Sequence, residues 1–187
     1  MDIQNQKSIT SKLSLNATTK EVEEAGMRYL EQEMTSFNWT QAAKDLYALT
    51  GAHYVMVCEY DEVGNTLITK AVDGIPMKVE TVISLLGFQL MGKKWTLFDG
   101  VKEELLKPEI KIIESVLEAS SYNLPEFVSF SIEKLLGVGV IYSKGFVHED
   151  KLLGNYVLFM GKNQKVTSFD NVNRLEKYIV RGLTASK

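Results

Sequence analysis

The sequence predicts a three-layer α/β/α sandwich of the α+β class, with one central sheet and helices on both of its faces. Two observations lead to this prediction. After residue 51 the spacing of apolar residues changes from three or four to two, which indicates a change from helix to strand. The strands that follow are apolar at successive positions, so helices are expected to cover both faces of the sheet. A chain of 187 residues is long enough for one such domain with a sizeable core.

The first part of the chain predicts a tail followed by two helices. Residues 1–15 are polar and show no periodicity, and we expect a flexible tail. An N-terminal helix is expected within residues 16–37, because Thr18 and Glu21 have the spacing of a capping box and apolar residues follow at helical intervals. Asn38 is a second predicted N-cap, and the helix that it begins is expected to end at Gly51.

Four extended segments predict the strands of the sheet. The first two are joined by an Asp-Glu-Val-Gly-Asn turn, which predicts a hairpin. In the last strand, alternation predicts Leu152 on the same face as Tyr156 and Leu158, with Leu153 on the opposite face. The predicted strands are residues 54–60, 67–72, 138–142 and 152–160. A terminal helix follows, and Ser168 is its predicted cap.

Between the two strand pairs the sequence predicts an insert made mainly of helices. Glycines at helix ends and a proline near a helix start mark its elements. In chain order we expect a helix with Val79, Val82, Ile83 and Leu86 that ends at Gly87, a short strand at 94–98, a helix near Pro108 with Ile110, Ile113, Val116 and Leu117, and a helix at 125–136 that ends at Gly137.

Composition excludes several classes of function. The net charge of −3 gives no basic surplus, so no nucleic-acid partner is expected. One cysteine and two histidines exclude an internal disulfide, a multi-cysteine zinc site and a histidine-rich metal centre. No apolar run approaches the length of a membrane span, and the first residues lack the apolar core of a secretory signal. We therefore expect a cytoplasmic protein without direct membrane contact.

Few residues have the surroundings that catalysis requires. Cys58 lies within a predicted strand and is expected to be a buried, unreactive thiol. His53 and His148 have no partner at metal-ligand spacing, and no sequence motif of a nucleophilic hydrolase, a nucleotide-binding loop or a metalloprotease occurs. Glu114 and Glu118 are four residues apart and share a face of the predicted helix, which leaves an enzyme that uses these two carboxylates as one alternative.

The insert carries an unusual number of aromatic side chains. Packing within the core is their default interpretation, but short helices over a sheet also form pockets for small apolar or aromatic ligands. The candidate ligand-binding residues are Phe88, Met91, Trp95, Phe98, Tyr122 and Phe130.

The order of elements and several segments resemble a GAF domain, the small-molecule sensory module of bacterial and archaeal signalling proteins. The resemblance covers about residues 38–184 and depends on Leu46-Tyr-Ala-Leu-Thr-Gly-Ala52, Ala71-Val-Asp-Gly74, Ile132-Glu-Lys-Leu-Leu-Gly137, Ile141-Tyr-Ser-Lys-Gly145 and Leu153-Gly-Asn-Tyr-Val-Leu-Phe159. It implies a GAF-like (profilin-like) antiparallel sheet of five or six strands, with the terminal helices on one face and a ligand pocket under the insert on the other.

Known ligand classes of the family do not carry over to residues of this chain. The signature of cyclic-nucleotide-binding members cannot be placed in it. Members that bind bilins attach them through a cysteine of the insert, whereas Cys58 lies on the first predicted strand. Members that reduce methionine sulfoxide need several cysteines, and this chain has one. The ligand and any cofactor are therefore unknown at this point.

The function predicted from the resemblance is that of a non-catalytic sensory domain in a signal-transduction protein. We expect a segment of a sensor histidine kinase in which a small ligand changes the packing of the terminal helices and thereby an output domain. A homodimer through residues 19–37 and 171–183 is expected as well. One alternative is a GAF-fold dimerisation or interaction module without a pocket, and the second is the enzyme that uses Glu114 and Glu118.

Overall fold

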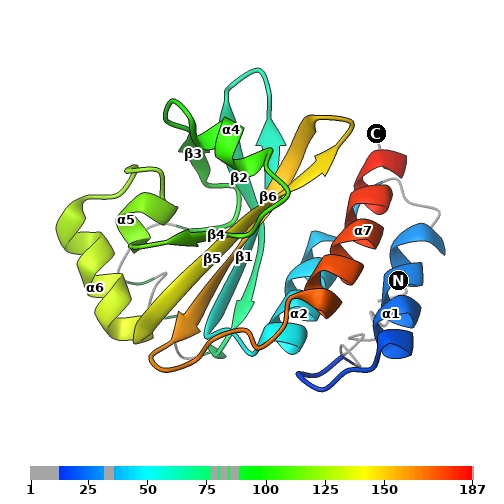
Figure 1. Ribbon diagram of the computed structural model, residues 1–187. Coiled ribbons are helices and arrows are strands. Elements are labelled where there is room, and N and C mark those ends of the chain that lie inside the picture. Colours follow the sequence, from blue (N-terminus) through cyan, green and yellow to red (C-terminus); the bar gives the residue numbers. More distant parts are fainter. Residues whose placement is uncertain (1–12, 32–35, 77–79, 81–83, 85–88, 187) are drawn as a thin grey trace, which may run out of the picture.

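A six-stranded antiparallel sheet forms the middle layer of the protein in a computed structural model that describes residues 13–31, 36–76, 80, 84 and 89–186 (Figure 1). The strand order is β3-β2-β1-β6-β5-β4, so the two long hairpins β1–β2 and β5–β6 meet in the centre along β1 and β6. The strands are β1 Tyr54–Asp61, β2 Thr66–Gly74, β3 Lys94–Thr96, β4 Lys111–Ile113, β5 Val138–His148 and β6 Lys151–Gly161.

Helices cover both faces of this sheet, which confirms the predicted three layers (Figure 1). The N-terminal and C-terminal helices lie together on one face, and the helices of the insert lie on the other. On the first face are α1 Thr19–Glu31, α2 Trp39–Thr50 and α7 Asp170–Ala185. On the insert face are α4 Val101–Leu105, α5 Val116–Ala119 and α6 Glu126–Leu136.

The predicted caps begin and end the first two helices. The Thr18 backbone amide donates to the Glu21 carboxylate, and the Glu21 amide donates to the Thr18 hydroxyl, which together form the capping box. The Asn38 side chain accepts from the Gln41 amide at 3.0 Å. Gly51 ends α2 in the left-handed conformation. Of the expected tail, the structure describes residues 13–15, and among them Leu13 is buried in the core.

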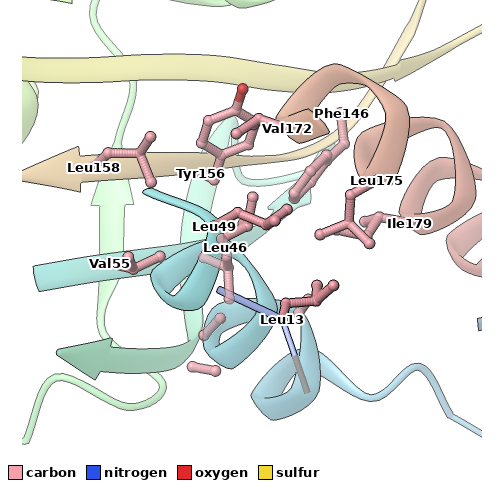
Figure 2. Packing of buried hydrophobic residues seen from close by; sticks show 14 of the residues in the cluster. Leu13, Leu46, Leu49, Val55, Phe146, Tyr156, Leu158, Val172, Leu175 and Ile179 are labelled. Carbon is pink, nitrogen blue, oxygen red and sulfur yellow. The ribbon is translucent and has the colours of Figure 1, made fainter. Parts of the chain in front are cut away.

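The two faces of β1 separate the two cores, as the alternation in the sequence predicts. Val55 and Val57 point toward the terminal helices, whereas Met56 and Cys58 point toward the insert. In Figure 2 the side chains of α2, β6 and α7 interdigitate on the terminal-helix face. A fully buried side chain of this kind contributes about 1.5–3 kcal/mol to stability. Members of that core include Leu46, Val55, Phe146, Tyr156, Leu158, Leu175 and Ile179.

One prediction for β6 is wrong because a bulge interrupts its alternation. Phe146 of β5 pairs with Gly154, but Val147 pairs with Leu152, so Leu153 is an extra residue in the ladder. Residues that precede the bulge in β6 therefore point to the faces opposite to those that strict alternation predicts. Leu153 therefore joins the terminal-helix core with Tyr156, and Leu152 faces the insert.

The insert differs most from its prediction. The prediction of a helix near Pro108 is wrong, because the described chain forms the edge strand β4 there. The short helix α5 begins only after Ser115, whose hydroxyl accepts from the Glu118 amide. Helix α4 was not predicted, and the strand expected at 94–98 ends at Thr96. Pro125 is the N-cap of α6 rather than its first residue. The helix expected around Val79, Val82, Ile83 and Leu86 lies outside the described residues.

A buried polar network joins the first two helices. Asp45 of α2 is fully buried and accepts from the Tyr29 hydroxyl at 2.9 Å and from the Gln41 amide group at 2.8 Å. The Arg28 guanidinium completes the network at 3.0 Å. Gly26 lies directly against the ring of Tyr178, so α1 and α7 approach each other too closely for any side chain there. The terminal helices thus form one packed layer.

Candidate ligand-binding cleft

The structure separates the six side chains that the sequence predicts for a ligand pocket. Trp95 lines a small apolar cavity, and Phe98 and Tyr122 line a larger cleft. Met91 and Phe130 are exposed and line neither space. Phe88 lies outside the described residues.

The small cavity lies between the sheet and the helices α5 and α6. Its volume is 40 Å³, which accommodates little more than a water molecule or two. Trp95 closes one side, and its indole donates to the Thr69 hydroxyl at 2.8 Å. The Tyr54 hydroxyl is buried and has no hydrogen-bond partner within the described part of the chain, and burial raises its pKa. The cavity is lined by Tyr54, Met56, Leu90, Trp95, Val116, Ala119, Ser120, Leu124, Ile132, Leu136 and Phe159.

The larger cleft has a volume of 820 Å³ and lies on the same face of the sheet. Its lining residues come from the segment that contains α4 and from α5 with its following loop. Gly145 in β5 lets the end of α4 approach the sheet, because a side chain there would collide with the Leu105 carbonyl. A volume of this size fits a drug-sized or cofactor-sized molecule.

Two polar side chains of the central strands form the floor of this cleft. Asn155 of β6 is only 3% exposed, and its amide nitrogen donates to the Ser143 hydroxyl of β5 at 3.3 Å. The Asn155 carbonyl oxygen has no hydrogen-bond partner among the described residues. Reversing the amide would only exchange the group without a partner, since Ser143 would then donate to the oxygen and leave the nitrogen alone. The Asn155 side chain therefore presents to the cleft a buried amide in which one polar atom has no hydrogen-bond partner among the described residues.

Asn155 and Ser143 are not among the binding residues predicted from the sequence. A signal was present, because Asn155 interrupts the otherwise apolar segment that became β6. Its meaning depends on register: Asn155 pairs with Cys58 of β1 and with Gly145 of β5, which places it in the middle of the insert face.

Two aromatic side chains lie at the mouth of the cleft. The rings of Phe98 and Tyr122 form an edge-to-face pair at 5.7 Å, and they remain 57% and 58% exposed. Asn123 ties their two segments together, since its side chain accepts from the Thr96 amide and donates to the Thr96 carbonyl. Tyr122 has a positive φ of 54°, as does its neighbour Ser121 at 48°. The loop is thus held in an unfavourable backbone conformation that presents the Tyr122 ring at the cleft.

Charged residues make the lining of the cleft predominantly acidic. In the part of the chain that the structure describes, Asp99, Glu104 and Glu118 line it together with a single ammonium group, that of Lys111. Lys111 is held by Glu118 at 2.9 Å. Burial alone would raise the pKa of Glu118, but the hydrogen bonds from Lys111 and from the Glu114 backbone amide lower it below its ordinary value. The Glu118 carboxylate is therefore ionised at neutral pH.

The predicted pair of carboxylates does not form. Glu114 precedes α5 rather than lying on it, so Glu114 and Glu118 do not share a helix face. Instead, the Glu118 carboxylate accepts from the Glu114 backbone amide at 3.2 Å. A low pKa suits an acceptor or an ion-pair partner, not a general acid, so the Glu118 carboxylate serves as an acceptor for Lys111 and for the Glu114 backbone.

The remaining candidate groups are structural or exposed. Cys58 is fully buried, and burial raises the pKa of its thiol to about 12, so the thiolate that reacts is suppressed. His53 lies with Nδ1 2.8 Å from the Leu136 carbonyl. His148 is exposed beside the Glu149 carboxylate. Among the described residues, no group of three histidine, cysteine or carboxylate side chains could hold a metal ion, and no helix there has the length and apolarity to cross a membrane.

A further hollow of 870 Å³ lies on the terminal-helix face, between the end of α2, the β6–α7 loop and the first turns of α7. Its buried polar group Thr50 is satisfied, because the hydroxyl donates to the Leu46 carbonyl at 2.7 Å. None of the unpartnered buried polar atoms of the described residues lies in this hollow. The cleft on the insert face is therefore the stronger candidate for a ligand site.

The architecture around the cleft is that of a GAF-like domain, which confirms the fold class and the resemblance predicted from the sequence. The solved structures similar to it include chromophore-binding domains of bacteriophytochromes, which contain a GAF domain. That of Stigmatella aurantiaca, in the Pr state, is 12% identical, with a TM-score of 0.58 over 88% of this chain and 57% of that chain. That of an unusual bacteriophytochrome from R. palustris is 15% identical, with a TM-score of 0.56 over 88% of this chain and 58% of that chain.

A longer structure of the R. palustris bacteriophytochrome matches with 15% identity and a TM-score of 0.60, over 91% of this chain and 37% of that chain. This chain thus spans little more than half of the two chromophore-binding domains and about a third of the longer chain. At these identities the similarity establishes the fold. No protein-family model matches the sequence, and neither does any curated protein.

Proposed function

We propose that this chain is a sensory domain that binds a small molecule in the cleft on the insert face and transmits its presence to α7. The fold supports the proposal, because similar structures are described as chromophore-binding domains. The cleft supports it as well, since its floor contains a buried amide whose oxygen has no hydrogen-bond partner among the described residues and can accept from a ligand.

The observation that carries the proposal is the connection between the cleft floor and α7 through β5. Ser143 faces the cleft, and the next residue, Lys144, points to the other side and forms an ion pair with Glu176 of α7 at 2.9 Å. The Lys144 ammonium also donates to the Asn173 side chain of α7 at 3.1 Å. A ligand that moves the floor of the cleft therefore acts one residue away from the groups that hold α7 in place.

A chromophore that is attached covalently through a cysteine has no suitable thiol in this chain. The only cysteine, Cys58, is fully buried in β1, and its thiol has a raised pKa. A covalent attachment there would require opening the core between the sheet and the insert. We therefore propose a ligand that is bound without a covalent bond.

The wider setting follows from the same resemblance. We propose a segment of a cytoplasmic signal-transduction protein, such as a sensor histidine kinase, with its output attached to the terminal helices. A homodimer through α1 and α7 belongs to this proposal. Most of the apolar side chains of these helices are used within the chain, but Met27 and Leu30 of α1 are exposed and are available for a second copy.

A second candidate function is an interaction module without a ligand, and α6 provides a specific reason to consider it. Phe127 and Phe130 are one helical turn apart and are 74% and 65% exposed. Two large aromatic side chains on one exposed helix face are typical of a protein contact.

Two measurements on the purified chain distinguish the sensory function from the interaction module. These are native mass spectrometry and thermal denaturation in the presence of nucleotides, biliverdin, amino acids and aromatic acids. A ligand of the folded state raises stability by about 2.7 kcal/mol at a hundredfold excess over its dissociation constant. A co-purified mass or a clear shift, with altered hydrogen exchange in α7, supports the sensory function. An empty chain that no compound stabilises contradicts it and favours the interaction module.

A further inference from the structure

We propose that the cleft on the insert face selects a planar nitrogen heterocycle that is neutral or positively charged and carries an N–H or amino donor. This inference rests on the proposed function, since it names the class of ligand for the same cleft. Three independent features of the cleft lead to it: the open acceptor of Asn155, the acidic lining and the exposed aromatic pair at the mouth.

The open acceptor requires a donor from the ligand. The Asn155 carbonyl oxygen is buried and without a partner among the described residues, while its amide nitrogen is held by Ser143. A buried acceptor that stays unsatisfied lowers stability, so a ligand that donates to it gains that free energy on binding. A ligand without an N–H or O–H group leaves the Asn155 oxygen unsatisfied and gains no such free energy.

The charges disfavour an anionic ligand. Among the described residues that line the cleft, Lys111 is the only cation, and Glu118 holds its ammonium group. Glu104 is engaged by Lys107, which leaves Asp99 as an exposed carboxylate without an ion pair within the described ranges. A phosphate or carboxylate in the cleft would have to displace Glu118 from Lys111 and would face the other two acidic groups. An amino or amidine nitrogen meets no such opposition.

The aromatic pair favours a flat ligand. More than half of the surface of Phe98 and of Tyr122 is exposed at the mouth, although both rings already contact each other. A planar ring that enters between these side chains and the floor buries apolar surface against them, and a positively charged ring adds attraction to their faces. The strained backbone at Tyr122 keeps one wall of this opening in position.

Three quinolines of nearly the same shape test the inference by isothermal titration calorimetry on the full chain. These are 2-aminoquinoline, which is a planar donor and partly cationic at neutral pH, quinoline-2-carboxylate, which is an anion, and 2-methylquinoline, which has no donor. We expect 2-aminoquinoline to bind at least about tenfold more tightly than either of the others. Equal affinities, tighter binding of the carboxylate, or no binding of the amine overturns the proposed class.

Variants locate the binding. Asn155→Leu removes the acceptor and is expected to weaken 2-aminoquinoline about tenfold or more, whereas Asn155→Asp keeps an acceptor, adds negative charge and should bind at least as tightly as the wild type. Tyr122→Ala is expected to weaken binding several-fold. Phe130→Ala, an exposed aromatic outside the cleft, is the matched control and should bind as the wild type does. If Asn155→Leu binds 2-aminoquinoline like the wild type, the acceptor is not the recognition group.

Hydrogen exchange of α7 separates this inference from the proposed function. If 2-aminoquinoline binds through Asn155 but leaves the exchange of α7 unchanged, the ligand class stands and the sensory function fails. If another compound of the screening panel, such as an aromatic acid, binds in the cleft and changes α7 while 2-aminoquinoline does not bind, the sensory function stands and the ligand class fails.

Discussion

Asn155 and Tyr156 are neighbours in β6 whose side chains lie on opposite faces of the sheet. The Asn155 amide faces the cleft under the insert, and the Tyr156 ring is buried on the other face, in the core that includes α2 and α7 (Figure 2). Tyr156 pairs with Lys144 of β5, the residue whose ammonium group holds Glu176 of α7. The cleft and the C-terminal helix are thus separated by the thickness of one sheet, and the strands themselves are the connection between them.

The double variant Asn155→Leu/Ser143→Ala is expected to stabilise the chain without ligand. It removes a buried acceptor that has no partner within the described part of the molecule, together with both members of the Asn155–Ser143 hydrogen bond, so the free energy of unfolding should rise by about 1 kcal/mol. Urea denaturation measures it. Asn123→Leu is the control: the Asn123 side chain bonds with both backbone groups of Thr96, and its loss should lower stability by about 1 kcal/mol. A purely structural role for Asn155 predicts destabilisation in both variants.

The pH dependence of stability should reveal Glu176. Burial raises the pKa of this carboxyl group above its ordinary value of 4.5, and the ammonium groups of Lys144 and Lys177 offset only part of the shift. Between the ordinary and the raised pKa the folded state binds more protons than the unfolded state, so stability falls as the pH rises through this window. Glu176→Gln should lack that contribution.

Denaturation at several pH values from 4.5 to 7 compares the wild type with Glu176→Gln. As the pH rises just above 4.5, the free energy of unfolding of the wild type should fall relative to that of Glu176→Gln. At higher pH the difference between the two should become constant. The same comparison with Glu23→Gln, at a partly exposed position of α1, separates an effect specific to Glu176 from the general effect of removing one negative charge. A difference that moves in favour of the wild type with rising pH contradicts the direction of the pKa shift.

Cys58 should react with a thiol reagent only when the protein opens. Its side chain is fully buried and its pKa is raised to about 12, so the native rate should be at least about a thousandfold below that of the unfolded chain. Labelling with a chromogenic disulfide, with and without urea, measures both rates. A cysteine at the exposed Val63 position, in the Cys58→Ala background, should react at the unfolded rate in native buffer. Rapid native labelling of Cys58 itself would show that the core between the sheet and the insert opens readily.

Dimerisation, if it uses α1, should depend on Leu30. Leu30 and Met27 are exposed one turn apart on this helix, and a charged side chain at Leu30 would be buried against a second copy at a cost of about 2 kcal/mol or more. Light scattering over a range of concentrations should find a dimer for the wild type and a monomer for Leu30→Glu. Lys20→Glu, on the exposed first turn of the same helix, should remain a dimer. A wild type that stays monomeric at high concentration contradicts the proposal.

The elements with local signals are those that the sequence predicts well. Capping side chains and αL glycines depend only on residues within one turn, so Asn38, Gly51 and Gly137 end or begin helices where the pattern indicates. The insert was harder because its elements are short. The spacing of Ile110, Ile113 and Val116 is that of a helix, but pairing of β4 with β5 takes residues 111–113 into the sheet edge. A tertiary contact overrides local periodicity when an element is only a few residues long.

The sequence by itself determines the three layers, the two-faced core and the buried state of Cys58, because each depends on the order of apolar and polar residues along the chain. Only the tertiary structure decided where a ligand could bind. Asn155, Lys111 and Tyr122 come from three separate segments, and strand pairing together with the packing of the insert brings them to one cleft. No local pattern encodes such a meeting, since hydrogen bonds across strands and the packing of the insert set it.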